Sequence, residues 1–276
     1  MRKAKDKTLK FLMSLCAAVT CLLLIGLIGY MLYRGIPGIN AKFLTTQTSY
    51  ISDSIGILPN ILNTLYLIVL VMIIVVPLGV GAAVYLTEYA SNKRISNAIG
   101  FAVETLTGIP SIIFGLVGML FFTQISGIRQ GILAGSLTLI IMVLPTVISN
   151  TKESLLAVPQ SYREGALALG SGKWHMVRTV VLPNAVDGIV TGCILAVGRV
   201  VGESAALLFT AGFGLKLLGF AEALQSSAAS LTVALYIYAS EEGKFDVAFS
   251  IAVILICITL IINLAASLVG KKVRKS

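Results

Sequence analysis

The chain has 276 residues, of which 57% are hydrophobic and only 12% are charged, and its formal net charge is +9 at pH 7. Soluble domains carry about 25% charged residues, so this composition excludes a water-soluble globule and indicates a membrane protein. The basic residues gather at the ends of apolar runs, which argues against a nucleic-acid-binding surface as the reason for the positive charge.

The first apolar run covers residues 11–33 and follows a basic start, residues 1–10, with five positive charges. A signal peptide shares this pattern, but its apolar centre is about 7–15 residues long. The run here has 23 residues, and no small-x-small cleavage site follows it. We therefore expect an uncleaved first membrane span.

Five more apolar runs approach or exceed the roughly 20 helical residues that cross the hydrocarbon core of a bilayer. They are residues 60–87, 99–122, 131–150, 189–212 and 247–270. Pro77 and Pro145 lie inside two of these runs, and a span tolerates proline where neighbouring helices satisfy the freed carbonyl. The expected fold class is therefore all-α, a polytopic membrane bundle of six transmembrane helices.

The basic residues are divided unequally between the two sides of such a bundle. With the N-terminus inside, the inner segments hold 15 of the 21 Lys and Arg residues and the outer segments hold 5, while Arg199 lies within a span. Positive charge concentrates on the cytoplasmic side, so we expect both termini and residues 151–188 to be cytoplasmic. The outer loop, residues 213–246, is weakly polar, and the sequence leaves open whether it dips into the membrane or lies on its surface.

A mostly polar stretch, residues 164–183, interrupts the apolar runs on the expected inner side. Ser161 and Glu164 have the spacing of a capping box, which predicts a helix start. The helix is expected to run to about Leu169, where Gly170 supplies the left-handed residue that ends helices. A second short helix is expected over residues 173–181.

Pro183 is expected to end this second helix. Trp174, Val177 and Val181 are three and four residues apart, so they are expected to share one face. A short helix with an apolar face suits docking into a groove of a partner. The alternative is a loop that only covers the inner end of the bundle.

The run GSGK at residues 170–173 looks like part of a phosphate-binding loop. The full pattern needs Gly at position 167 and Ser or Thr at position 174, where this chain has Leu167 and Trp174. We therefore do not expect this chain to bind ATP itself.

Three ionisable residues lie within the expected spans: Glu104, Arg199 and Glu203. A charge at the bilayer centre costs about 2.5–3.5 kcal/mol on insertion scales, so such residues face the bundle interior or mark a pathway. Arg199 and Glu203 are four residues apart and can bridge as a structural pair. Arg199 can instead offer its guanidinium to an oxyanion, and Glu104 can be a solvated helix end.

The polar stretch also resembles a known family. The inner-membrane subunits of binding-protein-dependent ABC importers carry the motif E-A-A, three residues, G, nine residues, I-x-L-P. This chain keeps that spacing, with Gly165 in place of Ala and Val180 in place of Ile. In that family the loop forms coupling helices that seat in a cleft of the ATPase subunit. The resemblance implies this coupling role for Glu164, Ala166, Gly170, Leu182 and Pro183.

Three further stretches resemble the phosphate-importer permease family called PstA. They are LPNILNTLYLIV at 58–69, ETLTGIPSIIFGLVG at 104–118 and GRVVGESAALLFTAG at 198–212, where Ser204 replaces the more common Thr. The resemblance implies a permease core over 57–276 with its coupling loop at 151–188, after an N-terminal tail, first helix and outer loop over 1–56. It also implies that Arg199, Glu203 and Glu104 lie on the phosphate route.

The resemblance implies a non-catalytic permease subunit of an ATP-driven phosphate importer in the bacterial inner membrane. Its implied partners are a PstC-like permease, two PstB-like ATPase subunits, an extracytoplasmic PstS-like binding protein and membrane lipids, without nucleic acid. We expect no cofactor and no metal, because the chain has one His and its four cysteines show no CxxC spacing. The alternatives are a permease for another oxyanion such as sulfate, the sister permease PstC, an ion-coupled secondary transporter and a membrane-embedded lipid phosphatase or transferase.

Overall fold

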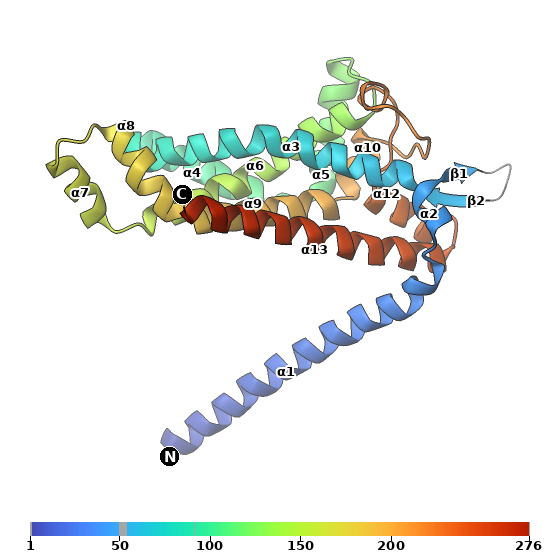
Figure 1. Ribbon diagram of the computed structural model, residues 1–276, viewed down its shortest axis with the longest axis horizontal. Coiled ribbons are helices and arrows are strands. Elements are labelled where there is room, and N and C mark those ends of the chain that lie inside the picture. Colours follow the sequence, from blue (N-terminus) through green and yellow to red (C-terminus); the bar gives the residue numbers. More distant parts are fainter. Residues whose placement is uncertain (1, 50–53, 91, 276) are drawn as a thin grey trace.

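Long helices lie side by side in the body of the molecule, and one long helix stands away from it (Figure 1). The computed structural model describes residues 2–49, 54–90 and 92–275. The long helices are α1 (Arg2–Gly35), α3 (Leu58–Val84), α6 (Ile132–Leu156), α9 (Leu182–Gly202) and α13 (Phe245–Lys275). By length and composition, the described residues form five helices that can cross a membrane, or six if one bent pair counts as a span. The helical membrane bundle is therefore confirmed.

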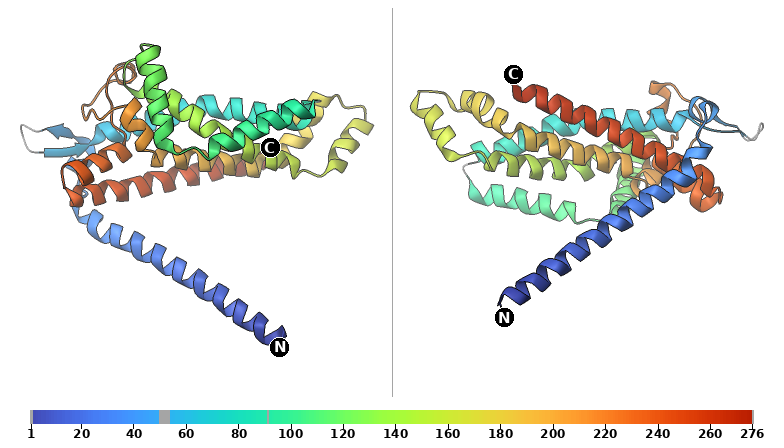
Figure 2. Two further views of the ribbon diagram at one scale, coloured as in Figure 1. Left: turned by 180° about the vertical axis from the view of Figure 1, so that it is seen from behind. Right: turned by 60° about the horizontal axis from the view of Figure 1, so that its bottom comes forward.

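Shorter elements connect the long helices. They are η1 (Ile36–Gly38), α2 (Ala41–Thr45), β1 (Gln47–Ser49), β2 (Ser54–Ile57), η2 (Tyr85–Tyr89), α4 (Lys93–Thr107), α5 (Ser111–Gly118), η3 (Met119–Ile125), α7 (Gln160–Ala168), α8 (Lys173–Met176), η4 (Val177–Val181), α10 (Ala205–Thr210), α11 (Phe220–Ala223), α12 (Leu231–Tyr236) and η5 (Ile237–Glu241). The antiparallel hairpin of β1 and β2 was not predicted. It lies at the end of the bundle opposite α7 (Figures 1 and 2).

The core lies between α3, α6 and α9, whose facing residues are mostly β-branched or small. Val71, Val75, Leu139 and Val143 are fully buried there. Pro77 and Pro145 both lie inside their helices, as expected. Close packing of small and branched side chains is what holds helices together in a bilayer, where lipid is as apolar as the helix surfaces.

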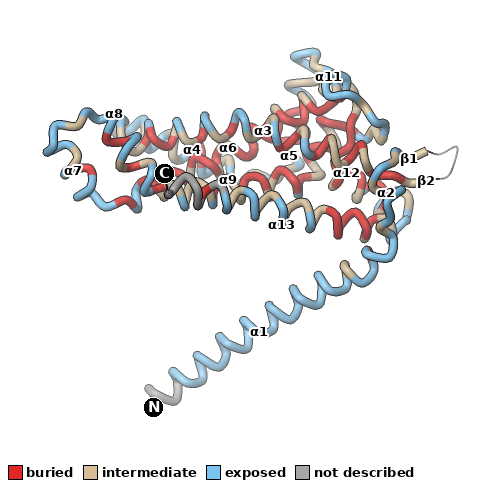
Figure 3. The backbone as a smooth tube through the Cα atoms, viewed as in Figure 1, coloured by how far each residue is buried: buried red, intermediate tan, exposed pale blue. Residues whose placement is uncertain are grey.

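The helix α1 diverges from this body along its whole length except at its last turns (Figures 1 and 3). None of its most apolar 18-residue window is buried. Near its end, the rings of Tyr30 and Phe249 meet edge to face at 5.5 Å between centroids, and Arg34 forms a 3.0 Å ion pair with Asp246. A helix that is apolar all round needs lipid or another protein along its free length.

The expected span over residues 99–122 is broken in two, so the prediction of one continuous helix is wrong. The helix α4 ends at Thr107, and α5 begins at Ser111 after a bend of 100° (Figure 2). Pro110 has no backbone N–H and pushes the residue before it out of the helical region. The sequence Gly108–Ile109–Pro110 therefore ends one helix and starts the next.

The expected span over residues 189–212 also has different bounds. Its helix begins at Lys173 and ends at Gly202, and α10 follows as a separate helix. The expected outer loop then folds back into the protein, where Ala228, Ala229 and Leu231 are fully buried. Asn60 Nδ2 donates to the carbonyl of Ala229 at 3.0 Å. This part of the loop is therefore packed against the first turns of α3.

Candidate functional site

The helix α7 lies at one end of the bundle and exposes nearly all of its surface (Figure 3). All nine of its residues are described, and Arg163 is the one that is buried. Tyr162 and Leu167 are about half exposed, and Leu169 directly after the helix is 90% exposed. Exposed large apolar side chains on a short helix favour docking to another protein.

The end of α7 confirms the predicted glycine turn. Gly170 has φ +79°, in the left-handed region that glycine adopts without strain. The N–H of Ser171 bonds the carbonyl of Ala166 at 3.1 Å, and the N–H of Gly170 bonds that of Leu167 at 3.0 Å. These two bonds are the Schellman pattern, which satisfies carbonyls left open at a helix end.

The predicted capping box at the start of α7 is wrong. The helix begins two residues earlier than a cap at Ser161 predicts, at Gln160, and Pro159 occupies the cap position without a side-chain cap bond. Ser161 therefore lies inside the first turn instead of at the cap. Glu164 is exposed, and its carboxylate has no hydrogen bond or ion pair within the described part of the chain.

Pro183 does not end a second short helix, so that prediction is also wrong. Helical residues run from Lys173 through α8, η4 and α9 to Gly202. In η4 the N–H of Leu182 bonds the carbonyl of Val177, one residue further back than in an α-helix. Pro183 follows this π-turn in the first turn of α9, where a missing N–H is tolerated.

The predicted shared face of three apolar residues is only partly correct. Val177 and Val181 are fully buried in an apolar cluster with Ala83, Leu155 and Met176. Trp174 is 61% exposed and lines a separate groove of about 580 Å³ together with Tyr85, Tyr89 and apolar residues of α3.

The predicted coupling residues divide into two sets. Ala166 and Leu182 are half-buried and pack on the apolar cluster around Val177. Glu164, Gly170 and Pro183 are exposed. The first set shapes the end of the bundle, and the second set is accessible to a partner.

A buried ion pair joins α7 to the body of the bundle, and the sequence did not indicate it. Arg163 Nε and Nη2 both donate to Glu88 Oε1, at 3.0 and 2.9 Å. Their side chains are only 11% and 6% exposed. The two residues are 75 positions apart, in loops expected to be solvated. No local pattern in one sequence indicates such a contact; correlated substitutions at the two positions among related sequences are the signal that could.

Arg199 lies half-buried on α9, and its guanidinium Nη1 donates to the hydroxyl of Thr146 on α6 at 3.2 Å. Within the described residues this is its one side-chain bond. Gly198 and Gly202 flank it, and a Cβ at either position meets no atom within 4 Å. A pocket of about 270 Å³ lies beside these two glycines.

Glu203 is buried but does not pair with Arg199. Since α9 ends at Gly202, the four-residue helical spacing that would bring the two side chains together is lost. Glu203 Oε1 instead accepts from the N–H of Ala206 at 3.0 Å, at the start of α10. Its carbonyl accepts from the hydroxyl of Thr232 at 2.8 Å.

Glu104 is exposed on α4, and its side chain has no hydrogen bond or ion pair among the described residues. The helix α4 packs on α6. The structure therefore brings Arg199 beside Thr146 but does not join Glu104 to Arg199 or Glu203.

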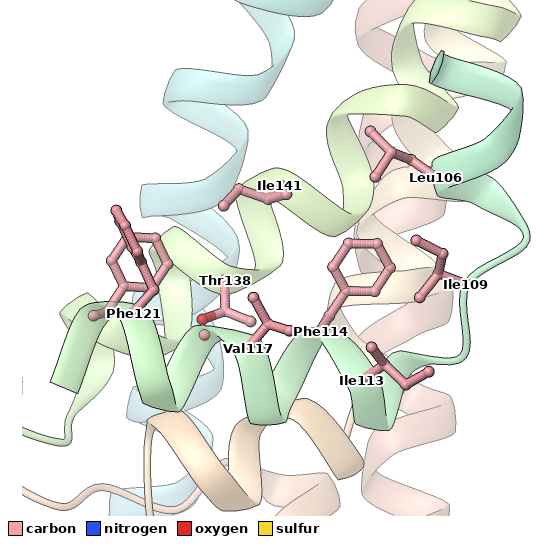
Figure 4. A pocket seen from close by; sticks show the side chains of 10 residues that line it. Leu106, Ile109, Ile113, Phe114, Val117, Phe121, Thr138 and Ile141 are labelled. Atoms are coloured by element: carbon pink, nitrogen blue, oxygen red, sulfur yellow. The ribbon is translucent and has the colours of Figure 1, made fainter. Parts of the chain in front are cut away.

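An apolar pocket of about 240 Å³ lies under the bend between α4 and α5 (Figure 4). Leu106, Ile109, Phe114 and Phe121 line it, and Thr138 is its one polar side chain. The hydroxyl of Thr138 donates to the carbonyl of Ala134 at 2.9 Å. The pocket therefore offers no free donor to an anion.

Residues 75–275 match the model of the family described as the binding-protein-dependent transport system inner membrane component. The probable ABC transporter permease protein YqgI of Bacillus subtilis is 37% identical over an alignment 287 residues long. The alignment covers 99% of this chain and 98% of that protein. The phosphate transport system permease protein PstA of Haemophilus influenzae is 32% identical, covering 76% and 74%. That of Xylella fastidiosa strain Temecula1 is 34% identical, covering 66% of this chain but only 63% of that protein.

Solved structures share the fold. The bacterial alginate ABC transporter, in complex with its alginate pentasaccharide-bound periplasmic protein, matches with a TM-score of 0.69 and 16% identity, over 100% of this chain and 98% of that one. The inward-facing MetNI methionine ABC transporter matches with a TM-score of 0.63 and 22% identity, over 79% and 94%.

Proposed function

The chain belongs to the family of inner membrane components of binding-protein-dependent transport systems, and we propose that it is a permease subunit of an ATP-driven importer of inorganic phosphate. The proposal rests most directly on the surroundings of Arg199, a half-buried cation inside the bundle. The similarity to permeases named for phosphate transport supports the same substrate.

Arg199 is proposed as the anion-binding group of the pathway. Its guanidinium has five N–H donors and uses one of its nitrogens on Thr146. Glu203 is engaged at the start of α10 and does not neutralise the arginine. A planar guanidinium with free donors suits the bidentate recognition of a phosphate oxyanion. Glu203 then has a positioning role, and Glu104 is proposed to lie along the same route.

The exposed face of α7 is proposed as the contact with a separate ATPase subunit. Glu164, Gly170 and Pro183 lie on the accessible surface, while Ala166 and Leu182 hold the underlying shape. ATP is hydrolysed by that partner, and this chain makes and breaks no bonds. Residues 57–276 form the permease core with its coupling loop at 151–188, and residues 1–56 precede it.

The proposed assembly contains this subunit, a homologous permease, two ATPase subunits and an extracytoplasmic phosphate-binding protein in a bacterial inner membrane. Both termini and α7 face the cytoplasm. Closure of the ATPase pair on ATP moves α7, and the bundle opens outward to receive phosphate. Hydrolysis of ATP then returns the bundle to its inward-open form.

The coupling role is tested by Glu164→Lys. The new positive charge on the exposed face of α7 is expected to reduce co-purification of the ATPase subunit about tenfold, while the helices still insert. Ser161→Ala is the matched control, because Ser161 makes no cap bond and its loss is expected to leave the complex intact. Parent-level assembly and uptake in Glu164→Lys would show that α7 is not the contact.

The substrate is tested by uptake of labelled inorganic phosphate into vesicles that contain the reconstituted complex and its binding protein. Excess unlabelled phosphate is expected to abolish the signal, and excess sulfate to leave it unchanged. Equal competition by sulfate would indicate a different oxyanion specificity. Uptake that continues without any ATPase subunit would contradict the proposal and favour a secondary transporter.

A further inference from the structure

One buried side chain of α7, that of Arg163, is hydrogen-bonded to the bundle. Eight of its nine residues are exposed or half-buried, and only Arg163 is buried. The helix also packs on α8 and η4, where Ala166 lies at the edge of an apolar cluster. The hydrogen bonds of Arg163 therefore give a force applied to the exposed face of α7 a direct route into the bundle.

The guanidinium of Arg163 bonds to three separate parts of the chain. Two of its nitrogens donate to Glu88 in η2, the helical continuation of α3. Its Nη2 also donates to the carbonyl of Leu155 in the last turn of α6, at 2.7 Å. Its Nη1 donates to the carbonyl of Val158, between α6 and α7, at 2.7 Å.

This arrangement fixes direction as well as distance. A guanidinium is planar and its N–H groups point along fixed lines, so four bonds to three partners orient it. The bonds to Glu88 are charge-assisted, and the bonds to the carbonyls of Leu155 and Val158 hold the guanidinium at the end of α6. The positive charge also lies at the negative end of the α6 dipole.

The partners of Arg163 belong to the packed part of the bundle. The helices α3 and α6 pack along each other around Val71, Val75, Leu139 and Val143. Displacement of their ends near Arg163 must therefore move two of the helices that form the core. The helix α6 also carries Thr146, which holds Arg199.

We propose that Arg163 and Glu88 form a rigid link that transmits movement of α7 to α3 and α6. The proposal rests on the coupling role of α7 given above and adds two positioning residues to it. Neither residue touches the transported anion or ATP in this assignment. The competing interpretation is that the two charges only neutralise each other to allow folding.

A double variant separates these interpretations. A single substitution leaves one buried charge without its partner and destabilises the protein in either case. Glu88→Leu combined with Arg163→Met removes both charges, and buried ion pairs replaced by apolar residues of similar volume are often neutral for stability. The double variant is therefore expected to assemble with its partners at the parent level. Arg94→Gln, an exposed arginine on α4, is the matched control.

The measurement is labelled inorganic phosphate imported per ATP hydrolysed by the full complex with its binding protein in vesicles. In the double variant this ratio is expected to fall at least fivefold, and ATP hydrolysis is expected to lose its dependence on the binding protein. Arg94→Gln is expected to keep both properties. If the double variant imported as much phosphate per ATP hydrolysed as the parent complex, the proposed link would be wrong.

If the double variant fails to assemble, Arg163→Lys distinguishes the two interpretations. Lysine keeps the positive charge but lacks the planar guanidinium, so the assembled complex is expected to import at least twofold less phosphate per ATP hydrolysed. A parent ratio there, or loss of assembly in both variants, would overturn the link in favour of a folding role. Failure of the parent complex to import phosphate counts against the proposed substrate instead, since the dependence of ATP hydrolysis on the binding protein still reports on the link.

Discussion

The guanidinium of Arg199 is not paired with Glu203, because that carboxylate bonds to the start of α10. The carboxylate of Glu203 accepts from the first turn of α10, and among the described residues the guanidinium of Arg199 makes one side-chain hydrogen bond, to the neutral hydroxyl of Thr146. A charge held this way is costly in a membrane and is tolerated where it has a function. The local break after Gly202 thus leaves the guanidinium of Arg199 without the carboxylate partner that helical spacing predicted.

Arg199→Ala is expected to reduce phosphate uptake at least tenfold while the complex still assembles, because it removes the donors proposed to bind the anion. Uptake of labelled phosphate and co-purification of the partners are measured on the same membranes. Thr146→Val is the matched control, since it removes the hydroxyl that Arg199 contacts but keeps the cation. Parent-level uptake in Arg199→Ala would assign the residue a structural role.

At this scale the sequence predicted the identity of charged residues in the spans but not their partners. Helical spacing suggested a pair between Arg199 and Glu203, and the break at Gly202 removed that spacing. Arg163 and Glu88 looked like solvated loop residues, and only the packing of α7 against α3 and α6 buries them. Contacts between distant segments depend on tertiary packing, and the spacing of residues along the sequence does not predict them.

At the scale of elements, the bend between α4 and α5 places α5 across the bundle, where it packs closely against α10. A Cβ built on Gly115 in α5 lies 2.7 Å from the Cα of Ala206. The neighbour is backbone and cannot rotate away. Glycine at this position therefore sets the distance between the two helices.

Gly115→Ala is expected to destabilise the protein by about 1–3 kcal/mol, the usual cost of overpacking a close contact. Thermal unfolding of the purified protein in detergent measures the change. Gly29→Ala in α1 is the control, because a Cβ there meets no atom within 4 Å and alanine is the better helix former. An unfolding temperature unchanged by Gly115→Ala would show that α5 and α10 separate freely.

The sequence predicted the long helices well and their breaks poorly. The length of the apolar runs alone located α1, α3, α6 and α13, because about 20 consecutive apolar residues indicate a helix that crosses the membrane. Pro77 and Pro145 lie inside helices, whereas Pro110 ends one. A proline carries the same local signal in all three cases, and the surrounding packing decides which helix continues.

At the scale of the whole molecule, the first turns of α1, the last turns of α13 and α7 lie toward one end, and the β1–β2 hairpin lies toward the other (Figures 1 and 2). Both ends of the described chain therefore lie toward the same end of the bundle as α7. The sequence did not predict the burial of Ala228, Ala229 and Leu231. A weakly polar loop has no periodic pattern of apolar residues that would show which side chains are buried.

Cysteine labelling tests the orientation. In a variant without the four native cysteines, Tyr162→Cys on α7 is expected to react with a membrane-impermeant maleimide only after the cells are opened. Lys42→Cys on α2, also exposed, is expected to react in intact spheroplasts. The basic inner segments are the physical reason, since positive charge is retained in the cytoplasm. The reverse pattern would invert the proposed topology.

The contact between α1 and α13 has a consequence for how the protein is made. The hydroxyl of Ser250 bonds the carbonyl of Gly35 across 215 residues of sequence, and α1 packs mainly against α13. Ribosomes synthesise the chain from its N-terminus, so α1 enters the membrane long before its docking site exists. The apolar surface of residues 11–33 allows α1 to remain in lipid until then, and its packing against the body can be completed only after the last helix has been inserted.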